Sequence, residues 1–256
     1  MRIADLNWMQ VEAYLRHDDR CILPFGSTEQ HAQLSLCVDA ILAEKVAVEA
    51  AEPLGIPVYP AMPFGLAPYF ASFPGSISLK VETLLAVARD LIESVARAGF
   101  RRILIVNGHG GNAPVGALAL QMMTEQPALS IKFHNWYNQP RTWETAMAID
   151  RSGSHGNWME NFPWTRLANA PSPSGSKPSV DMALMKASPP ARVREMLGDG
   201  SFGGEWRKPD EDMLRLWSAG VAETRAALGG HGRPDSHLGR RCDWRHVWCA
   251  SDTRGA

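Results

Sequence analysis

The stretch RRILIVNGHGGN, residues 101–112, joins an apolar run to a glycine-rich turn. Four consecutive apolar residues, 103–106, lead directly into the turn. An uninterrupted run of this kind is typical of a central parallel strand that is covered on both faces. Glycines in the turn allow the backbone to approach a ligand closely. The stretch therefore predicts a buried parallel strand that ends at a ligand-binding loop.

Helix and strand patterns alternate on both sides of this strand. The helix before it carries apolar residues on one stripe of 3.6-residue period and ends at Gly99, a typical C-cap glycine. Alternation of this kind requires right-handed crossovers and predicts an α/β fold with a mostly parallel sheet. The other expected elements are strands at 21–25, 56–60 and 129–137 and helices at 39–55, 81–99 and 113–126.

A second loop, GSTEQHAQLSLCVDA at residues 26–40, follows the strand expected at 21–25 and contains Glu29, His31 and Asp39. Carboxylate oxygen and imidazole nitrogen are ligands that zinc and manganese accept readily. Ligand sites of parallel sheets lie outside the carboxyl ends of the strands. We therefore expect this loop to meet His109 of the glycine-rich turn.

Each of these patterns also has a simpler explanation. The 26–40 loop is compatible with a solvated loop, and the 101–112 stretch with a tight strand–helix turn. A third pair of candidate ligands, His155 and Glu160, is compatible with a helix cap and a solvated helix face.

Composition and charge indicate an ordinary globular protein. The chain has 256 residues, of which 45% are hydrophobic and 21% charged, and its net charge of −1 gives no bias toward nucleic acid or an anionic membrane. No signal-peptide pattern opens the sequence, and no apolar stretch reaches the length of about 18 residues that spans a bilayer. We expect a cytoplasmic protein with reduced thiols, because its four cysteines form no CxxC pair.

The sequence predicts one domain over residues 1–232. A tail over 233–256, rich in Arg, Trp and Gly, follows it. We expect the tail to be a loosely held extension or a contact between subunits.

The motifs resemble a known family when they are taken together. GSTEQH with Asp39, FPGSISL at 73–79, NGHGGN and a later His-x4-Glu occur in this order in creatininase-like amidohydrolases. The resemblance covers roughly residues 20–165. It implies a three-layer α/β/α sandwich and a centre of two divalent ions, zinc and/or manganese, with iron also suitable. It also implies a homo-oligomer, commonly a hexamer.

The resemblance also assigns ligands by motif position. Glu29 and His109 would bind one ion, His31 would bind the other, and Asp39 would bridge the pair. Creatininases themselves supply the last ligand from a glutamate inside the glycine loop, where this chain has Gly111. Glu160 is the candidate for that role.

The implied chemistry is hydrolysis of a small cyclic carbonyl substrate. Water held between two ions attacks the carbonyl carbon as hydroxide, and the bridging Asp39 fixes the spacing of the ions. Backbone N–H groups near Gly110 and Gly111 are candidate donors to the developing oxyanion. His155 is a candidate general acid or, alternatively, a hydrogen-bond partner of a ligand. For each tryptophan named here, core packing is expected at least as much as a pocket role. The candidate pocket residues are Ser76, Tyr69, Phe70, Trp158, Trp136 and Trp164.

Two departures from the family pattern concern the substrate. The loop EQHAQLSLCVD is one residue shorter than usual and lacks a second histidine, and Trp158 stands where an acid is common. Creatinine itself is therefore not expected as the substrate. Cleavage of a C–N bond in a cyclic amide is the first hypothesis, and hydrolytic C–C opening of an oxidised inositol ring is the second. A metal-binding scaffold without turnover is the third.

Overall fold

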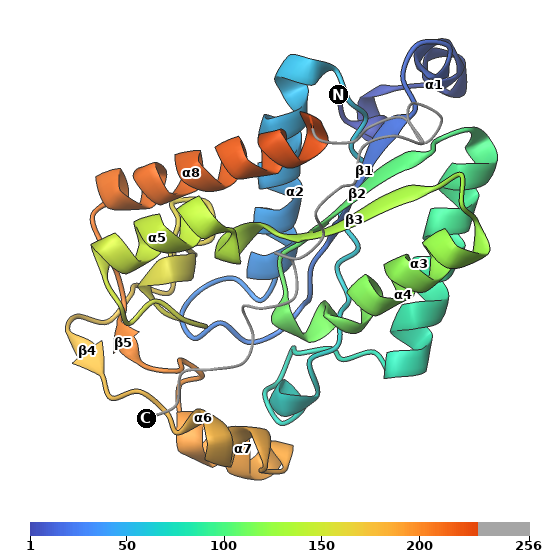
Figure 1. Cartoon of the computed structure of the whole chain (residues 1–256). Coiled ribbons are helices and arrows are strands. Elements are labelled where there is room, and N and C mark those ends of the chain that lie inside the picture. The colour runs from blue at the N-terminus through green and yellow to red at the C-terminus, as the bar shows by residue number, and fades with distance from the viewer. Residues whose placement is uncertain (230–256) are drawn as a thin grey trace.

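The computed structural model describes residues 1–229, so the predicted tail and the boundary at residue 232 lie outside the described residues. Three parallel strands form the central sheet in the order β1 (Arg20–Phe25), β2 (Arg102–Asn107) and β3 (Ser130–Asn135) (Figure 1). Phe25, Asn107 and Asn135 pair across the three strands, so all three strands end at one level. The predicted parallel sheet is confirmed.

Helices cover both faces of this sheet (Figure 1). One layer consists of α2 (Val38–Ala51), α5 (Pro140–Ile149) and α8 (Asp210–Gly229), and the other of α1 (Trp8–Leu15), α3 (Val81–Ala98) and α4 (Pro114–Glu125). Successive side chains of a strand point to opposite faces. Leu104 and Val106 accordingly pack in the cluster under α2 and α8, and Ile103 and Ile105 in the cluster under α3 and α4. The three-layer α/β/α sandwich is confirmed.

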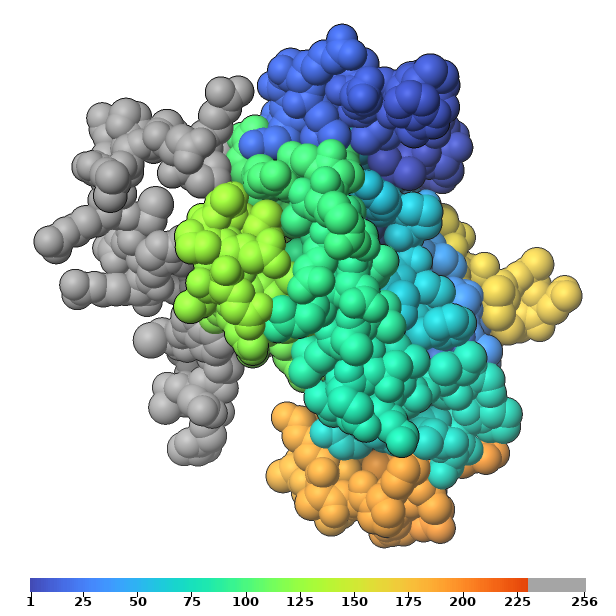
Figure 2. All heavy atoms as spheres, turned by 90° about the vertical axis from the view of Figure 1, so that its right-hand side faces the viewer, coloured from blue at the N-terminus to red at the C-terminus, as the bar shows by residue number. Residues whose placement is uncertain are grey.

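A smaller C-terminal part lies at the end of the sandwich opposite α1. It contains the short helices α6 (Met182–Lys186) and α7 (Pro190–Leu197) and an antiparallel pair, β4 (Ser176–Lys177) and β5 (Gly204–Glu205). Figure 2 shows α3 and α4 between α1 at one end and the orange α6–α7 unit at the other. The remaining helical turns are 3-10 turns at Ile3–Asp5, Glu52–Leu54, Pro68–Phe70, Gly110–Asn112, Trp136–Asn138 and Trp158–Glu160.

The regular strand predicted at 56–60 is wrong. The segment does run parallel to β1, since Ile22 N–H donates to the Pro57 carbonyl and Tyr59 N–H donates to the Ile22 carbonyl, both at 3.0 Å. Pro57 has no N–H group to donate to β1, however, and Pro24 of β1 has none to donate in return, so the ladder between the two segments is interrupted. Only isolated bridges therefore form beside β1.

Two other expectations differ in their extent. The helix expected at 39–55 ends as α-helix at Ala51 and continues as a 3-10 turn to Gly55, whose φ is 61°. The helix cap and helix face offered as alternatives for His155 and Glu160 correspond only to the short 3-10 turn Trp158–Glu160. Within residues 1–229, no helix combines the length and apolarity needed to cross a bilayer.

His134 on β3 predicts an acid-dependent loss of stability. Its imidazole is buried, with Nε2 3.0 Å from Thr224 Oγ1 on α8, and burial lowers its pKa from 6.5 to about 4. Below about pH 6.5 the unfolded chain binds a proton on this imidazole, whereas the folded chain binds it only below about pH 4. The free energy of unfolding therefore falls as the pH is lowered from about 6.5 to about 4. We expect His134→Gln to remove about 3 kcal/mol of this pH-dependent change.

The measurement is urea unfolding of both proteins at pH 7 and pH 4. Because other titrating groups act alike in the two proteins, the difference between their pH dependences isolates His134. Identical pH dependences would contradict the prediction.

Candidate metal centre

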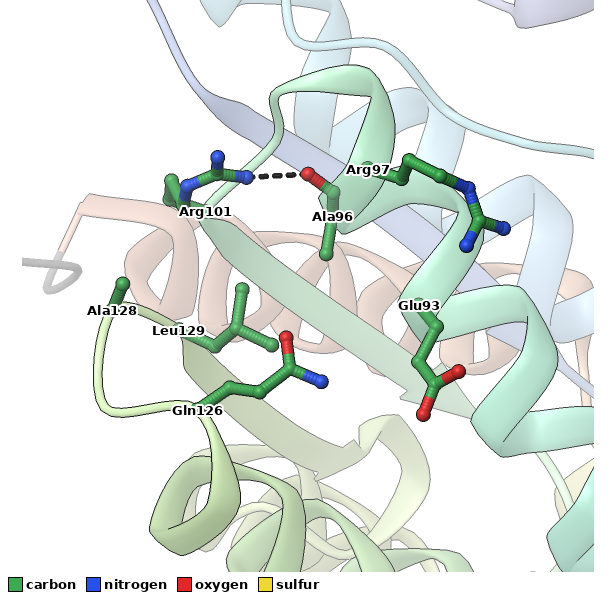
Figure 3. A pocket seen from close by; sticks show the side chains of 7 residues that line it. All are labelled: Glu93, Ala96, Arg97, Arg101, Gln126, Ala128 and Leu129. Carbon is green, nitrogen blue, oxygen red and sulfur yellow. Dashed lines mark hydrogen bonds between the residues drawn. The ribbon is translucent and has the colours of Figure 1, made fainter.

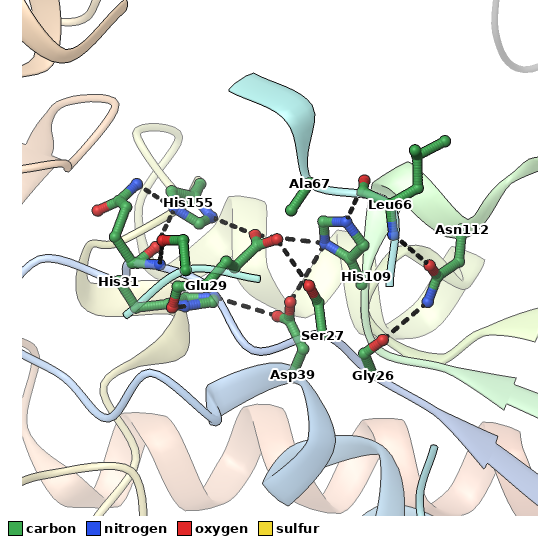
Figure 4. Close-up of polar contacts among 12 residues, drawn as sticks. Gly26, Ser27, Glu29, His31, Asp39, Leu66, Ala67, His109, Asn112 and His155 are labelled. Atoms are coloured by element: carbon green, nitrogen blue, oxygen red, sulfur yellow. Dashed lines mark hydrogen bonds and ion pairs between the residues drawn. The ribbon is translucent and has the colours of Figure 1, made fainter. Parts of the chain in front are cut away.

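Several chain segments bring acids and histidines together at the carboxyl end of the sheet (Figure 4). The loop after β1 supplies two of these side chains, the first turn of α2 one, the loop after β2 one, and residues 155–160 the last two. These six candidate residues are Glu29, His31, Asp39, His109, His155 and Glu160. The structure thus gathers all the predicted ligands and the predicted general acid.

Asp39 lies between the two histidines that follow β1 and β2. Its Oδ1 is 3.1 Å from His31 Nε2, and its Oδ2 is 3.2 Å from His109 Nδ1. The carboxylate is 3% exposed, and within the described part of the chain its Oδ2 has no hydrogen-bond partner. A buried carboxylate oxygen without a donor is costly unless a cation meets it.

Backbone carbonyls fix the orientation of both imidazoles. His31 Nδ1 lies 3.0 Å from the Glu29 carbonyl, and His109 Nε2 lies 2.9 Å from the Leu66 carbonyl. A carbonyl oxygen only accepts, so these nitrogens carry the hydrogen. In the neutral form of each imidazole the nitrogen that faces Asp39 therefore carries a lone pair, as in metal-binding histidines whose other N–H is donated to a backbone carbonyl.

Two further carboxylates complete two overlapping ligand groups. Glu29 Oε1 lies 3.3 Å from His109 Nδ1, while its Oε2 accepts a hydrogen bond of 2.9 Å from Ser27 Oγ. Glu160 Oε2 lies 3.8 Å from His31 Nε2. Glu29, Asp39 and His109 form one group, and His31, Asp39 and Glu160 form the other, with the ligand atoms of each group within 4.8 Å of one another. Asp39 belongs to both groups.

A third group of possible ligands overlaps these two. It consists of Glu29, His31 and His155. His155 Nδ1 is 3.8 Å from Glu29 Oε1.

The electrostatics of the cluster favour cations. Burial disfavours a charged His31, but Asp39 and Glu160 outweigh burial and raise its pKa to about 10. The pKa of His109 is likewise raised well above its usual value by Glu29 and Asp39, against the effect of burial. Burial raises the pKa of Glu160 to about 7. The negative charge of the carboxylates thus favours positive charge in this buried site, here as protons on the two imidazoles. A set of oxygen and nitrogen donors without a thiolate suits zinc, manganese and iron.

Two asparagines of the NGHGGN motif brace the cluster. Asn112 Nδ2 donates to the Gly26 carbonyl at 3.0 Å, and its Oδ1 accepts from Leu66 N–H at 3.2 Å. Asn107 Nδ2 donates to the His109 carbonyl at 2.6 Å. These bonds tie the ends of β1 and β2 to the loop that carries the carbonyl partner of His109.

Close packing in the NGHGGN motif requires a glycine at position 111. A Cβ at this position would lie 1.9 Å from the Leu66 carbonyl oxygen and 2.4 Å from His109 Nε2. The neighbouring Gly110 is exposed, and a Cβ there would meet only the Tyr137 hydroxyl, at 3.6 Å. A glutamate side chain is therefore sterically excluded at position 111, whereas Glu160 already lies beside His31.

The predicted pocket residues have different environments. Ser76 Oγ accepts the backbone N–H of Gln30 at 3.0 Å and so supports the ligand loop. Tyr69 is 37% exposed, whereas the adjacent Phe70 stacks on His155 with ring centroids 4.7 Å apart. Trp158 is fully buried in the core and offers no surface to a substrate, which favours its core-packing alternative.

The other two tryptophans also pack among aromatic side chains. Trp136 is 3% exposed in the same core cluster as Trp158. Trp164 stacks on Phe162 with ring centroids 5.4 Å apart.

His155 is held by residues that sequence patterns did not single out. Its ring centroid lies 4.7 Å from that of Phe202, and its Nε2 lies 2.8 Å from Gln30 Nε2. The Gln30 amide also donates to the Gly200 carbonyl at 3.0 Å. Burial, aided by the charge of His31, lowers the pKa of His155 well below its usual value, so its imidazole is neutral. Gln30 stands inside the quoted motif, but Phe202 is distant in sequence and carries no motif.

A surface hollow lies at the opposite end of the sheet (Figure 3). Arg101, which precedes β2, donates from its guanidinium to the carbonyl groups of Ala96 in the last turn of α3 and of Phe100, which follows that helix. The hollow shares no residue with the metal cluster. It is lined by Glu93, Ala96, Arg97, Arg101, Gln126, Ala128 and Leu129.

Sequence comparisons identify relatives of the chain. Creatinine amidohydrolase of Pseudomonas putida is 34% identical over 119 residues, which cover 43% of this chain and 45% of that protein. The 3-dehydro-scyllo-inosose hydrolase of Thermotoga maritima is 29% identical over 133 residues, covering 50% and 42%. A mycofactocin precursor peptide peptidase of Mycobacterium tuberculosis is 40% identical over 108 residues, covering 38% and 42%. Each alignment spans less than half of the relative's own length.

Solved structures share the fold. A creatininase with one tryptophan substitution has a TM-score of 0.74 at 22% identity, covering 89% of this chain and 97% of that chain. Creatininases described as the Zn–Zn type and as creatininase Mn have TM-scores of 0.70 and 0.68 at 20% and 21% identity, each covering 89% of this chain and 96% of the other. The family model for creatininase, described as creatinine amidohydrolase, matches residues 4–236. The chain therefore belongs to the creatininase family.

Proposed function

We propose that this chain is a metal-dependent hydrolase that holds two divalent ions. One ion would be held by Glu29, Asp39 and His109, and the other by His31, Asp39 and Glu160. The observation that carries the proposal is the position of Asp39, whose two oxygens face one histidine nitrogen each at 3.1 and 3.2 Å. Structural relatives described as Zn–Zn and Mn forms support zinc or manganese as the ions.

The side chains of the site supply binding, orientation and proton transfer. When bound, two such ions lower the pKa of water and polarise a carbonyl oxygen. Within the described residues, the backbone N–H groups of Gly110 and Gly111 donate no hydrogen bond, so both are available to a substrate oxygen. The neutral imidazole of His155, with Nδ1 toward Glu29, is placed to take up a proton and to pass it to a leaving group.

Cleavage of a C–N bond in a small cyclic amide is the reaction we propose first. Two of the relatives have names that denote C–N cleavage, a creatinine amidohydrolase and a peptide peptidase. The relative that hydrolyses 3-dehydro-scyllo-inosose supports ring opening of an oxidised inositol as the second candidate. A homo-oligomer, a hexamer by family resemblance, is part of the proposal. Light scattering measures its mass.

An assay of the metal-loaded protein tests the proposed function. The substrates are cyclic amides including creatinine, short peptides and keto-inositols, each incubated with zinc- or manganese-loaded protein and with chelator-treated protein. We expect turnover that chelation abolishes and added metal restores. Two bound ions without turnover of any compound would contradict the hydrolase and favour a metal-binding scaffold.

Glu160→Gln is expected to remove one ion and leave the other. Glu160 belongs only to the group that it forms with His31 and Asp39, so metal content measured by elemental analysis should fall from about two ions per chain to about one. Glu82→Gln, which changes an exposed acid of α3, is the matched control and should keep both ions. Two ions retained in Glu160→Gln would show that this carboxylate is not a ligand.

A further inference from the structure

A tyrosine follows β3 at the same edge of the sheet as the metal cluster. Asn107 of β2 pairs in register with Asn135 of β3, so His109 and Tyr137 each stand two residues beyond this pair. Ser27 stands two residues beyond Phe25, the partner of Asn107 on β1. Ser27 bonds to Glu29 and His109 faces Asp39, so two of the three equivalent positions already serve the cluster.

The ring of Tyr137 is fixed, whereas its hydroxyl is unpartnered. The ring packs against the core and meets Trp136 edge-on, with centroids 6.3 Å apart. The hydroxyl lies 3.6 Å from the position of a Cβ on the exposed Gly110. Among residues 1–229, no group forms a hydrogen bond with this hydroxyl. A phenol on a packed ring thus lies beside the exposed residue that follows the candidate ligand His109, without a partner of its own.

The hydroxyl is also held in its protonated form. Burial raises the pKa of Tyr137 above its usual value, and the charges of Asp39 and Glu160 raise this pKa further. Both carboxylates belong to the candidate ligand groups. A protonated phenol is a hydrogen-bond donor at all ordinary pH values.

We propose that the Tyr137 hydroxyl binds the substrate by donating a hydrogen bond to the oxygen of its carbonyl group. The inference rests on the proposed hydrolase function. A neutral donor on a fixed ring stabilises negative charge that develops on that oxygen, at no cost of reorganisation. The ligand class is any small molecule that presents a carbonyl oxygen to the metal cluster.

The test is binding of acetohydroxamate, a small carbonyl probe, to the zinc-loaded protein. Calorimetry is run on the wild type, on Tyr137→Phe and on Tyr59→Phe. Tyr59 packs in the cluster on the α3 side of the sheet, so its variant is a matched control for loss of one phenol hydroxyl. We expect Tyr137→Phe to weaken binding of acetohydroxamate by about tenfold, which corresponds to the loss of one hydrogen bond. The Tyr59→Phe variant should bind like the wild type.

Metal content distinguishes a failure of the role proposed for Tyr137 from a failure of the proposed hydrolase function. Full metal content in Tyr137→Phe with unchanged affinity for acetohydroxamate would overturn the role of Tyr137 and leave the hydrolase proposal intact. A wild type that binds no metal after zinc is supplied would overturn the proposed function, and the inference would fall with it. For a substrate found in the panel, we expect Tyr137→Phe to lower kcat by about 10²-fold and to change KM little.

Discussion

Asp39→Ala is expected to remove both metal ions from the protein. Asp39 is the only residue common to the two ligand groups, and each of its oxygens faces a different histidine. Without it, each group keeps two ligands, and the cations lose the buried charge that attracts them. Elemental analysis should show a fall from about two ions per chain to nearly none, with loss of all metal-dependent turnover.

Two companion variants make this result interpretable. Asp90→Ala, which removes an exposed acid of α3, should keep the wild-type metal content. Asp39→Asn preserves the volume of the side chain and one carbonyl oxygen, so it separates loss of charge from loss of packing. Circular dichroism verifies that each variant is folded. A folded Asp39→Ala protein that retains two ions would refute the bridging role.

Gly111→Ala is expected to destabilise the protein and to displace His109. The added methyl group would stand 1.9 Å from the Leu66 carbonyl oxygen and 2.4 Å from His109 Nε2, so the hydrogen bond between these groups cannot survive. Because one of the clashing atoms belongs to the backbone, relaxation is limited. We expect a loss of about 3 kcal/mol, which lowers Tm by roughly 6–12 °C in a chain of this size.

Gly110→Ala is the matched control, because it adds the same methyl group one residue earlier. There the methyl would meet only the Tyr137 hydroxyl, at an ordinary contact distance of 3.6 Å. Calorimetric Tm and metal content should both stay close to those of the wild type. Equal losses in the two variants would mean that any side chain disturbs the loop, and that the contact between Leu66 and His109 is not the cause.

Local patterns were sufficient to predict the first half of the fold. Apolar runs at β1 and β2 and the apolar stripe of α3 depend on neighbouring residues, which a sequence displays directly. The segment 56–60 failed because proline donors are missing, although its position beside β1 follows the expected layout. Trp158 was ambiguous because a tryptophan beside a ligand motif suits a pocket as well as a core, and only tertiary packing decides between them.

Part of the metal cluster was predictable from the sequence, because neighbouring parallel strands end at the same edge of the sheet. Glu29 and His109 follow two such strands, and the shared edge brings them within 3.3 Å. Tyr137 was overlooked, although its place two residues beyond Asn135 matches that of His109 beyond Asn107. The contact of Phe202 with His155 could not be predicted from the sequence, because it depends on the packing of a distant segment.

Anomalous diffraction from crystals of the zinc-loaded protein tests the central claim most directly. The account predicts two peaks per chain, one among Glu29, Asp39 and His109 and the other among His31, Asp39 and Glu160, with Asp39 between them. A single peak among Glu29, His31 and His155, the third possible group, would contradict the bridged pair of ions, as would density at neither of the two predicted positions.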